Sequence, residues 1–211
     1  MPNSGESPEE RFARAIPLAG TEGQDYVQRR GVTLEVACAA DVRFDENYGG
    51  RAAVLVAMRD EEDRLRTLHG RYLHTKQGQS KMLSIGTGEG VINVLGGWRA
   101  EPLIIVEGLF DALSLASCGV PAVATVGCRT SWLPTVAVGR TVWLAFDACK
   151  PGEADVVLYK KLLPQSDVHR MTPPPRCKDW NTALVKRGRA ALSRWLQELI
   201  FNQAVKYEKT L

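Results

Sequence analysis

The sequence has no apolar run long enough to span a membrane. Residues 1–10 also lack the basic start and apolar core of a secretory signal, so we expect a cytoplasmic protein that does not contact membranes. The cysteines are odd in number and form no close pair, which indicates reduced thiols and no zinc ribbon. They are Cys38, Cys118, Cys128, Cys149 and Cys177. The formal net charge of +3 is too small to identify a nucleic-acid-binding protein by itself.

Short uncharged runs lie between residues 103 and 147, and two of them stop at a carboxylate, Glu107 or Asp147. Such runs are typical of strands in a parallel sheet that is buried on both faces. Residues 109–118 carry apolar side chains at helical spacing and stop at Gly119, which predicts a crossover helix and therefore a βαβ unit. Because open parallel sheets bind ligands beyond the carboxyl ends of their strands, we expect an acidic site there.

Three stretches of this region resemble a Toprim domain: Glu107-Gly108, Asp111-Ala112-Leu113 and Phe146–Gly152. Bacterial-type primases, topoisomerases and certain nucleases share that domain. Its pattern is a Glu after the first strand and an Asp-x-Asp after a later one. The resemblance implies an α/β fold, with a mainly parallel Toprim-type sheet flanked by helices. In this chain Cys149 replaces the second Asp of the Asp-x-Asp pattern.

The chain has 211 residues, of which 45% are hydrophobic. This length and composition suit one compact domain or two small subdomains. We expect a small mixed α+β subdomain before the Toprim unit and an amphipathic helix after it. The expected divisions are a flexible lead-in over 1–19, the mixed subdomain over 20–100, the Toprim domain over 101–185 and the final helix over 186–211.

The mixed subdomain is expected to hold short helices followed by strands. A half-exposed antiparallel hairpin is predicted from the alternation in its second strand. Helices are predicted over 8–15, 21–30, 33–40 and 153–163, and strands over 52–58, 65–73, 91–95 and 168–171. Arg29 and Arg30, at the end of the second helix, are interpreted as solvated surface, and a nucleic-acid contact is the alternative.

Two short segments of the mixed subdomain are similar to segments that precede the Toprim unit in bacterial-type primases. They are Gly70-Arg71-Tyr72-Leu73 and Lys81-Met82-Leu83-Ser84. The resemblance implies that Arg71 and Lys81 face the acidic site across a groove and bind phosphates of template or nucleotide. Lys150 and Lys178, beside the acidic motifs, join them as candidates. An ordinary basic face on an exposed strand is the alternative for the first two.

The segment Lys178-Asp179-Trp180-Asn181 resembles the Lys-Asp-x-Asp/Asn step that follows the last Toprim strand in primases. Asp179 would add a carboxylate to the site, and Asn181 a neutral oxygen ligand. The alternative is that Asp179 caps the N-terminus of the closing helix, and both roles are compatible.

Clustered carboxylates suit Mg²⁺ or Mn²⁺, which neutralise charge in phosphoryl transfer. The candidate ligands are Glu107, Asp111, Asp147 and Asp179, with Glu107 and Asp147 as the catalytic pair. Ion pairs that serve only structure are the alternative. A thiol is a poor ligand for a hard cation, so Cys149 should weaken the second metal position unless Glu153 or Asp155 compensates.

The expected function is that of a primase-type nucleotidyltransferase core, which makes RNA primers on single-stranded DNA in replication. Its partners would be the template, ribonucleoside triphosphates, and either a replicative helicase or a separate zinc-binding module. A Toprim nuclease is the rival enzyme. A catalytically weak, nucleic-acid-binding replication accessory of a mobile element is the non-enzymatic rival, and Cys149 favours it.

Overall fold

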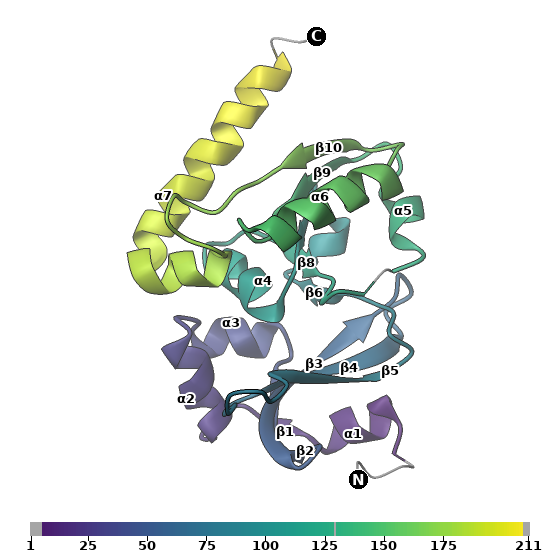
Figure 1. Ribbon diagram of the computed structural model, residues 1–211, viewed down its shortest axis with the longest axis vertical. Coiled ribbons are helices and arrows are strands. Elements are labelled where there is room, and N and C mark those ends of the chain that lie inside the picture. The colour runs from purple at the N-terminus through teal and green to yellow at the C-terminus, as the bar shows by residue number, and fades with distance from the viewer. Residues whose placement is uncertain (1–5, 129, 209–211) are drawn as a thin grey trace.

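In the computed structural model of the protein, two five-stranded sheets are stacked on a shared layer of helices (Figure 1). The structure describes residues 6–128 and 130–208, with side chains to residue 200. Within these ranges no helix combines the length and the apolar content that a membrane-spanning segment needs.

The first sheet is antiparallel throughout, in the order β1-β2-β3-β4-β5. Its strands are β1 Ile16–Pro17, β2 Arg43–Tyr48, β3 Arg51–Arg59, β4 Leu65–Tyr72 and β5 Met82–Gly86. Its helices are α1 Pro8–Arg14, α2 Glu22–Arg29 and α3 Leu34–Ala39. The expected helices are thus present, with Ser7, Thr21 and Thr33 as their N-caps.

The predicted antiparallel hairpin is present as β3 and β4, but both faces of the first sheet are covered, so the prediction that it is half-exposed is wrong. Along β3, residues 54, 56 and 58 enter a core shared with the second sheet, while 53, 55 and 57 pack in a separate core with Phe12 of α1. The expectation of a loose lead-in is therefore also wrong for residues 6–19, since α1 packs on β3 and β4. Residues 1–5 lie outside the described residues.

The second sheet has the order β10-β9-β7-β8-β6, and all its neighbours are parallel except β6 and β8. Its strands are β6 Ile92–Val94, β7 Leu103–Val106, β8 Ala122–Ala124, β9 Thr141–Leu144 and β10 Asp167–Arg170. Its helices are η1 Gly97–Arg99, α4 Leu109–Ala116, α5 Leu133–Val136, α6 Lys150–Leu162 and α7 Trp180–Glu208. The predicted βαβ unit is β7-α4-β8.

Two helices begin earlier than the sequence predicted. Helix α6 starts at Lys150, because Pro151 fits the first turn of a helix, where no N–H is needed. The helix expected over 186–211 begins earlier because it is joined to the helix that starts at Trp180. Together they form α7, which bends at the non-helical Gly188 (φ 77°). Leu192 and Leu196 of its second half are buried in the shared core. Figure 1 shows the far end of α7 extending away from both sheets.

Gly152, in the first turn of α6, lies directly on the backbone of Asp147. A Cβ atom at this position would stand 2.2 Å from the Asp147 carbonyl oxygen. Helix α6 can therefore approach the carboxyl end of β9 only with glycine here, and this approach sets the position of the carboxylate predicted to be catalytic.

We expect Gly152→Ala to lower the free energy of unfolding by about 1–3 kcal/mol, because α6 must move away from β9. Chemical denaturation measures this change. Lys160→Ala, on the exposed side of the same helix, is the matched control and should stay within about 0.5 kcal/mol of wild type. A stability of Gly152→Ala equal to that of the control would contradict the close packing.

Candidate functional site

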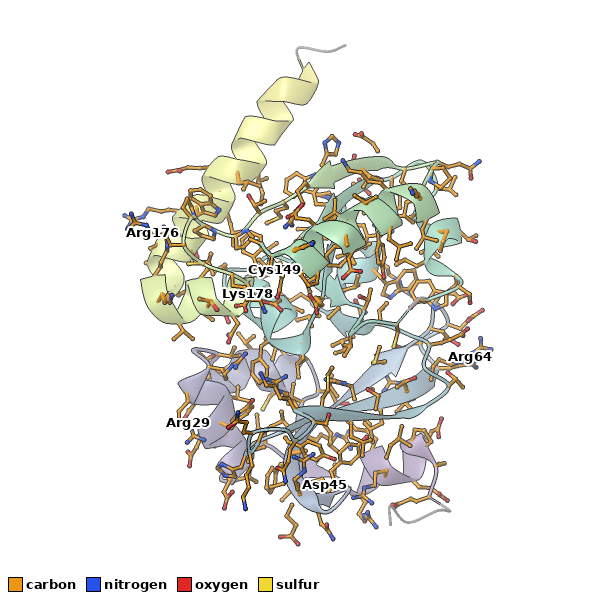
Figure 2. The ribbon with its side chains drawn as sticks, viewed as in Figure 1. Arg29, Asp45, Arg64, Cys149, Arg176 and Lys178 are labelled. Carbon is orange, nitrogen blue, oxygen red and sulfur yellow. The ribbon has the colours of Figure 1, made fainter. Side chains whose placement is uncertain are left out.

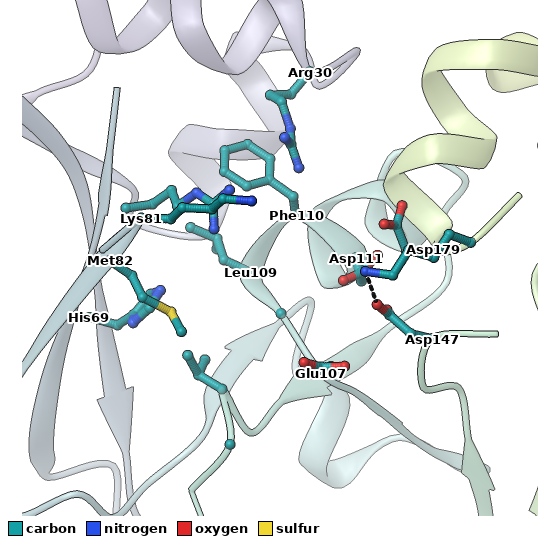
Figure 3. Close-up of a pocket in the computed structure, with 15 residues that line it drawn as sticks. Arg30, His69, Lys81, Met82, Glu107, Leu109, Phe110, Asp111, Asp147 and Asp179 are labelled. Carbon is teal, nitrogen blue, oxygen red and sulfur yellow. Dashed lines mark ion pairs between the residues drawn. The ribbon is translucent and has the colours of Figure 1, made fainter. Parts of the chain in front are cut away.

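A pocket of ≈390 Å³ lies between the two sheets, with acidic groups on one side and basic groups on the other. The four predicted carboxylates all line it. Glu107 follows β7, Asp111 lies in the first turn of α4, Asp147 follows β9 and Asp179 precedes α7. Residues that are up to 72 positions apart in the sequence are thus brought together (179 − 107 = 72). Figure 3 shows the acidic side chains on the side of the second sheet.

The opposite side of the pocket belongs to the first sheet and to helix α2. Arg71 of β4 and Lys81, which precedes β5, line it as the resemblance implied. Arg30 and His69 line it too: Arg30 had been interpreted as solvated surface in preference to a nucleic-acid contact, and His69 had been given no role in the site. No ion pair joins these cations to the acidic side among the described residues, so the two charged walls face each other across open space.

Among the described residues that line the pocket, Lys178 is the one cation on the acidic side. Its Nζ lies 2.9 Å from Oδ2 of Asp147, and this hydrogen bond, with the Asp147 charge, raises the pKa of Lys178. The charge of Asp179 raises it further, and Cys149 lies close enough to contribute. Asp147 is buried while the Lys178 side chain is 63% exposed, so the ammonium can leave the carboxylate without moving the backbone.

Asp111 occupies the base of the acidic wall. Burial raises its pKa to about 7, and the charges of Asp179 and Asp147 act in the same direction. Its Oδ1 accepts hydrogen bonds from the backbone N–H groups of Trp180 and Asn181, at 3.0 and 3.2 Å. Asp111 therefore caps α7 from a neighbouring helix, and its second oxygen remains available to a ligand.

Glu107 reaches into the open part of the pocket. The pocket walls partly remove water from its carboxyl group and raise its pKa, and the charges of Asp147 and Asp155 add to the effect. Of the two compensating residues proposed for Cys149, Asp155 is near enough for its charge to act on Glu107, but neither residue lines the pocket. Glu153 is instead bonded to Arg170, whose Nη2 lies 2.6 Å from Oε1.

Asp179 has the capping role that the sequence left open: its Oδ1 accepts from the backbone N–H of Thr182 at 2.6 Å. Its other oxygen is free to face the pocket. Asn181 does not line the pocket. Its buried side chain donates to the carbonyl oxygen of Arg30 at 2.8 Å and to Ser114 Oγ at 3.0 Å, so it ties α2 to α4.

Cys149 and Lys150 stand at the start of α6 and are not among the residues that line the pocket. Cys149 is the N-cap of this helix, and its side chain makes no capping hydrogen bond. It is close enough to Lys178 to raise that residue's pKa, and Figure 2 shows the two side chains in the same region of the molecule.

His69 is a pocket residue that the sequence interpretation treated as part of a strand only. Its ring is buried, and burial with the nearby Arg71 charge lowers its pKa to about 4, so the imidazole is neutral at pH 7. Nδ1 lies 3.0 Å from Ser84 Oγ. The sequence contained one indication that His69 lines the pocket. It is two residues from Arg71, and this spacing places both side chains on one face of β4.

The donor atoms of the pocket fit a divalent cation that keeps part of its water. The donors on its acidic side are carboxylate oxygens, which hard cations prefer. No three of the pocket residues, however, bring one oxygen each within 4.8 Å of one another; in the described residues only Asp60, Glu61 and Glu62 do so. One or two of the pocket carboxylates, with water and substrate oxygens completing the shell, is the usual arrangement for Mg²⁺.

Two parts of the sequence match known families. Residues 104–184 match the Toprim-like family, and residues 4–86 match a domain of unknown function, DUF7146. No curated protein matches the sequence. The chain therefore carries a Toprim-like domain, as the motifs at Glu107 and Asp147 indicated.

Solved primase structures share the fold of this chain. The zinc-binding and RNA polymerase domains of Aquifex aeolicus primase match 92% of it with a TM-score of 0.67 and 18% identity. This chain covers 62% of that protein, less than two thirds of its length. A DnaG primase catalytic domain bound to ssDNA matches with a TM-score of 0.65 and 20% identity. The match covers 92% of this chain and 80% of that one. The primase fragment of the bacteriophage T7 primase-helicase matches with a TM-score of 0.57 and 18% identity. That match covers 83% of this chain and 76% of the T7 fragment. These structures confirm the predicted fold class.

The raised pKa of Asp111 predicts a pH-dependent stability. The unfolded group ionises near pH 4 and the folded group near pH 7, so the folded protein binds more protons between these values and loses stability as pH rises. Asp111→Asn keeps the Oδ1 acceptor and removes the charge. We expect the Tm of the variant to rise relative to that of wild type from pH 5 to pH 7, by about 3–6 °C per pH unit.

Thermal melts in a chelator measure this difference. The pH effect of His69 cancels because both proteins contain it. Asp25→Asn, on the exposed surface of α2, is the control. A Tm difference between Asp111→Asn and wild type that is the same at both pH values would show that the carboxyl group has an ordinary pKa.

Proposed function

We propose that this chain is a primase-type nucleotidyltransferase core, which makes RNA primers on single-stranded DNA in replication. The single observation that supports this most directly is the pocket in which Arg71 and Lys81 face Glu107, Asp147 and Asp179. A polyanion needs cations to hold its phosphates, and a hard metal ion needs carboxylates to hold it. One pocket of this chain offers both. The likeness to primase catalytic domains supports the same function.

Each wall has a separate task in this proposal. Glu107, Asp147 and Asp179, with the free oxygen of Asp111, would hold Mg²⁺ or Mn²⁺. When bound, the metal neutralises charge on the reacting phosphate. Arg71 and Lys81 bind and orient template or nucleotide phosphates against the acidic wall. Lys178 moves from Asp147 toward a phosphate oxygen, and Lys150, at the outer edge, contacts more distant phosphates.

The proposed ligands are single-stranded DNA and ribonucleoside triphosphates. A replicative helicase or a separate zinc-binding module would complete the assembly, because the larger Aquifex aeolicus protein carries a zinc-binding domain of its own. The second candidate function is that of a nucleic-acid-binding replication accessory with little turnover. Cys149 is the specific observation that favours it, since a thiol replaces a carboxylate next to the acidic wall.

Primer synthesis tests the proposal. Labelled ribonucleotides, single-stranded DNA and either Mg²⁺ or Mn²⁺ should give short RNA products. Glu107→Gln should lower their rate by about 100-fold or more, because it removes a charged oxygen at the reacting phosphate. Glu198→Gln, on the exposed surface of α7, should leave the rate unchanged. DNA cleavage that depends on Glu107 would identify a nuclease instead, and DNA binding without either product would identify the accessory.

Cys149→Asp tests the effect of the thiol. An aspartate at the N-cap should raise the unfolding free energy by about 0.5–2 kcal/mol, because its side chain can accept from the free N–H groups of α6. It should also tighten Mn²⁺ and raise nucleotidyl transfer, because it adds a charged oxygen beside Asp147. Cys149→Asn caps the helix equally and adds no charge, so it separates the two effects. Equal Mn²⁺ affinity in both variants, measured by titration calorimetry, would show that position 149 is not part of the metal site.

A further inference from the structure

His69 is a buried polar side chain in the wall of the pocket, and one of its ring nitrogens has no partner. The residue belongs to β4, is 2% exposed and lines the pocket. Nδ1 lies 3.0 Å from Ser84 Oγ, and within the described part of the chain the ring makes no other hydrogen bond. Because both nitrogens of an imidazole can take part in hydrogen bonds, Nε2 remains available to a ligand in the pocket.

The other two histidines of the chain have different surroundings. Nε2 of His74 lies 3.9 Å from Glu22, and Nε2 of His169 lies 2.8 Å from Asp167, so each has a carboxylate beside it. His69 has none: burial and a neighbouring arginine charge lower its pKa to about 4. The ring is therefore neutral at pH 7 and does not attract phosphate as a cation would.

The surface next to His69 is apolar and uncovered. In the pairing of β4 with β5, Met82 lies opposite Arg71 and Ser84 lies opposite His69, so the four side chains share one face of the sheet. Met82 lines the pocket and is 45% exposed, which is unusual for a large hydrophobic residue of this protein. Figure 3 shows His69 and Met82 extending from the first sheet toward the pocket.

The turn after β8 adds uncharged surface to the same pocket. Val126 and Gly127 both line it. Val126 has a φ of 49°, a left-handed conformation that costs free energy for a β-branched residue, and its N–H donates to the carbonyl oxygen of Glu107 at 2.8 Å. Backbone strain of this kind is concentrated at ligand sites. The pocket thus contains an uncharged part in addition to its acidic and basic residues.

The uncharged groups indicate which part of a nucleotide they contact. A thioether and a neutral imidazole bind neither phosphate nor a hard cation well, but they match the two surfaces of a nucleobase. The sulfur of methionine makes favourable contacts with aromatic rings, and an imidazole nitrogen forms hydrogen bonds with a polar ring edge. Since His69 is two residues from Arg71 on one strand face, about 6.6 Å along β4 separates a base contact from a phosphate contact.

We propose that His69 and Met82 form a nucleobase-binding corner of this pocket, in which Met82 contacts the face of the base and Nε2 of His69 hydrogen-bonds its edge. The inference rests on the proposed function and adds to it contacts with the uncharged part of the substrate. The base belongs either to an entering nucleoside triphosphate or to the single-stranded template, and the two sources are distinguished by experiment.

His69→Asn tests the role of Nε2. The asparagine side chain is long enough to keep a polar atom near the position of Nδ1 and Ser84, but it does not reach the position of Nε2. His69→Gln extends an amide to that position and should recover part of the lost affinity. Circular dichroism shows whether each variant is folded. Met82→Ala changes an exposed side chain, so it tests the corner independently of the buried histidine.

Two binding experiments compare ligands with and without bases. In one, titration calorimetry measures the affinity for each of the four ribonucleoside triphosphates with Mn²⁺ and for tripolyphosphate. In the other, fluorescence anisotropy measures the affinity for a labelled oligodeoxynucleotide of mixed sequence and for an abasic strand of the same length. We expect His69→Asn and Met82→Ala to lose about 10-fold in affinity for the base-carrying ligand of one experiment or of both. Tripolyphosphate and the abasic strand should bind as they do to wild type.

His74→Asn is the matched control, because it makes the same substitution at a histidine whose side chain is 78% exposed and which does not line the pocket. It should bind every ligand as wild type does. Unchanged binding of all base-carrying ligands by folded His69→Asn or by folded Met82→Ala overturns the inference. An equal loss for ligands with and without bases overturns it too, since His69 would then act on phosphates or on the fold.

Arg71→Met separates this failure from that of the proposed function. If Arg71→Met weakens binding of tripolyphosphate or the abasic strand and the two corner variants bind bases as wild type does, the proposed function stands and the corner is only a surface. If none of these variants weakens binding of any nucleotide or DNA, the proposed function fails together with the inference.

Discussion

The crowding of four carboxyl groups at the carboxyl ends of β7 and β9 is the constraint on which the pocket depends. Burial and mutual repulsion raise the pKa values of Asp111 and Glu107. Lys178 offsets part of the repulsion by pairing with Asp147. The backbone N–H groups at the start of α7 offset another part by bonding Asp111. A lysine and the N-terminus of α7 therefore both stabilise negative charge on the acidic wall.

Apolar packing, and not ion pairing, sets the distance between the two charged walls. Strand β3 sends alternate side chains into the core that it shares with β7, and β7 does the same from the other side. Among the described residues, no ion pair crosses the pocket. Opposite charges are therefore held apart by a rigid core, and their attraction is left to act on whatever ligand enters between them.

The strands of the Toprim unit could be predicted because a buried parallel strand is recognised by its uncharged run, and two of these runs stop at carboxylates. The burial of β3 on both faces could not be predicted from its own residues, because the elements that cover its two faces come from distant parts of the sequence. Arg30 was missed for a related reason. It lies on the helix face of Tyr26 and Val27, which is the buried face of α2, yet arginines at helix ends are mostly solvated. Only the packing of Phe110 against it distinguishes this arginine from Arg29.

The thiol at position 149 changes the balance of charge around Lys178. The pocket lining holds four carboxylates and four cations, Arg30, Arg71, Lys81 and Lys178. An aspartate at the N-cap of α6 would add a further negative charge near Lys178 and leave Asp147 freer for a metal. With cysteine there, Asp147 is the only ion-pair partner of Lys178 among the described residues, so an entering cation competes directly with the ammonium. The Lys178 ammonium leaves Asp147 with the smallest loss of free energy when a phosphate oxygen can accept its hydrogen bond instead. On the proposed function, metal and substrate phosphate would therefore bind together more tightly than either binds alone, and Cys149 would strengthen this coupling by leaving Lys178 without a second carboxylate.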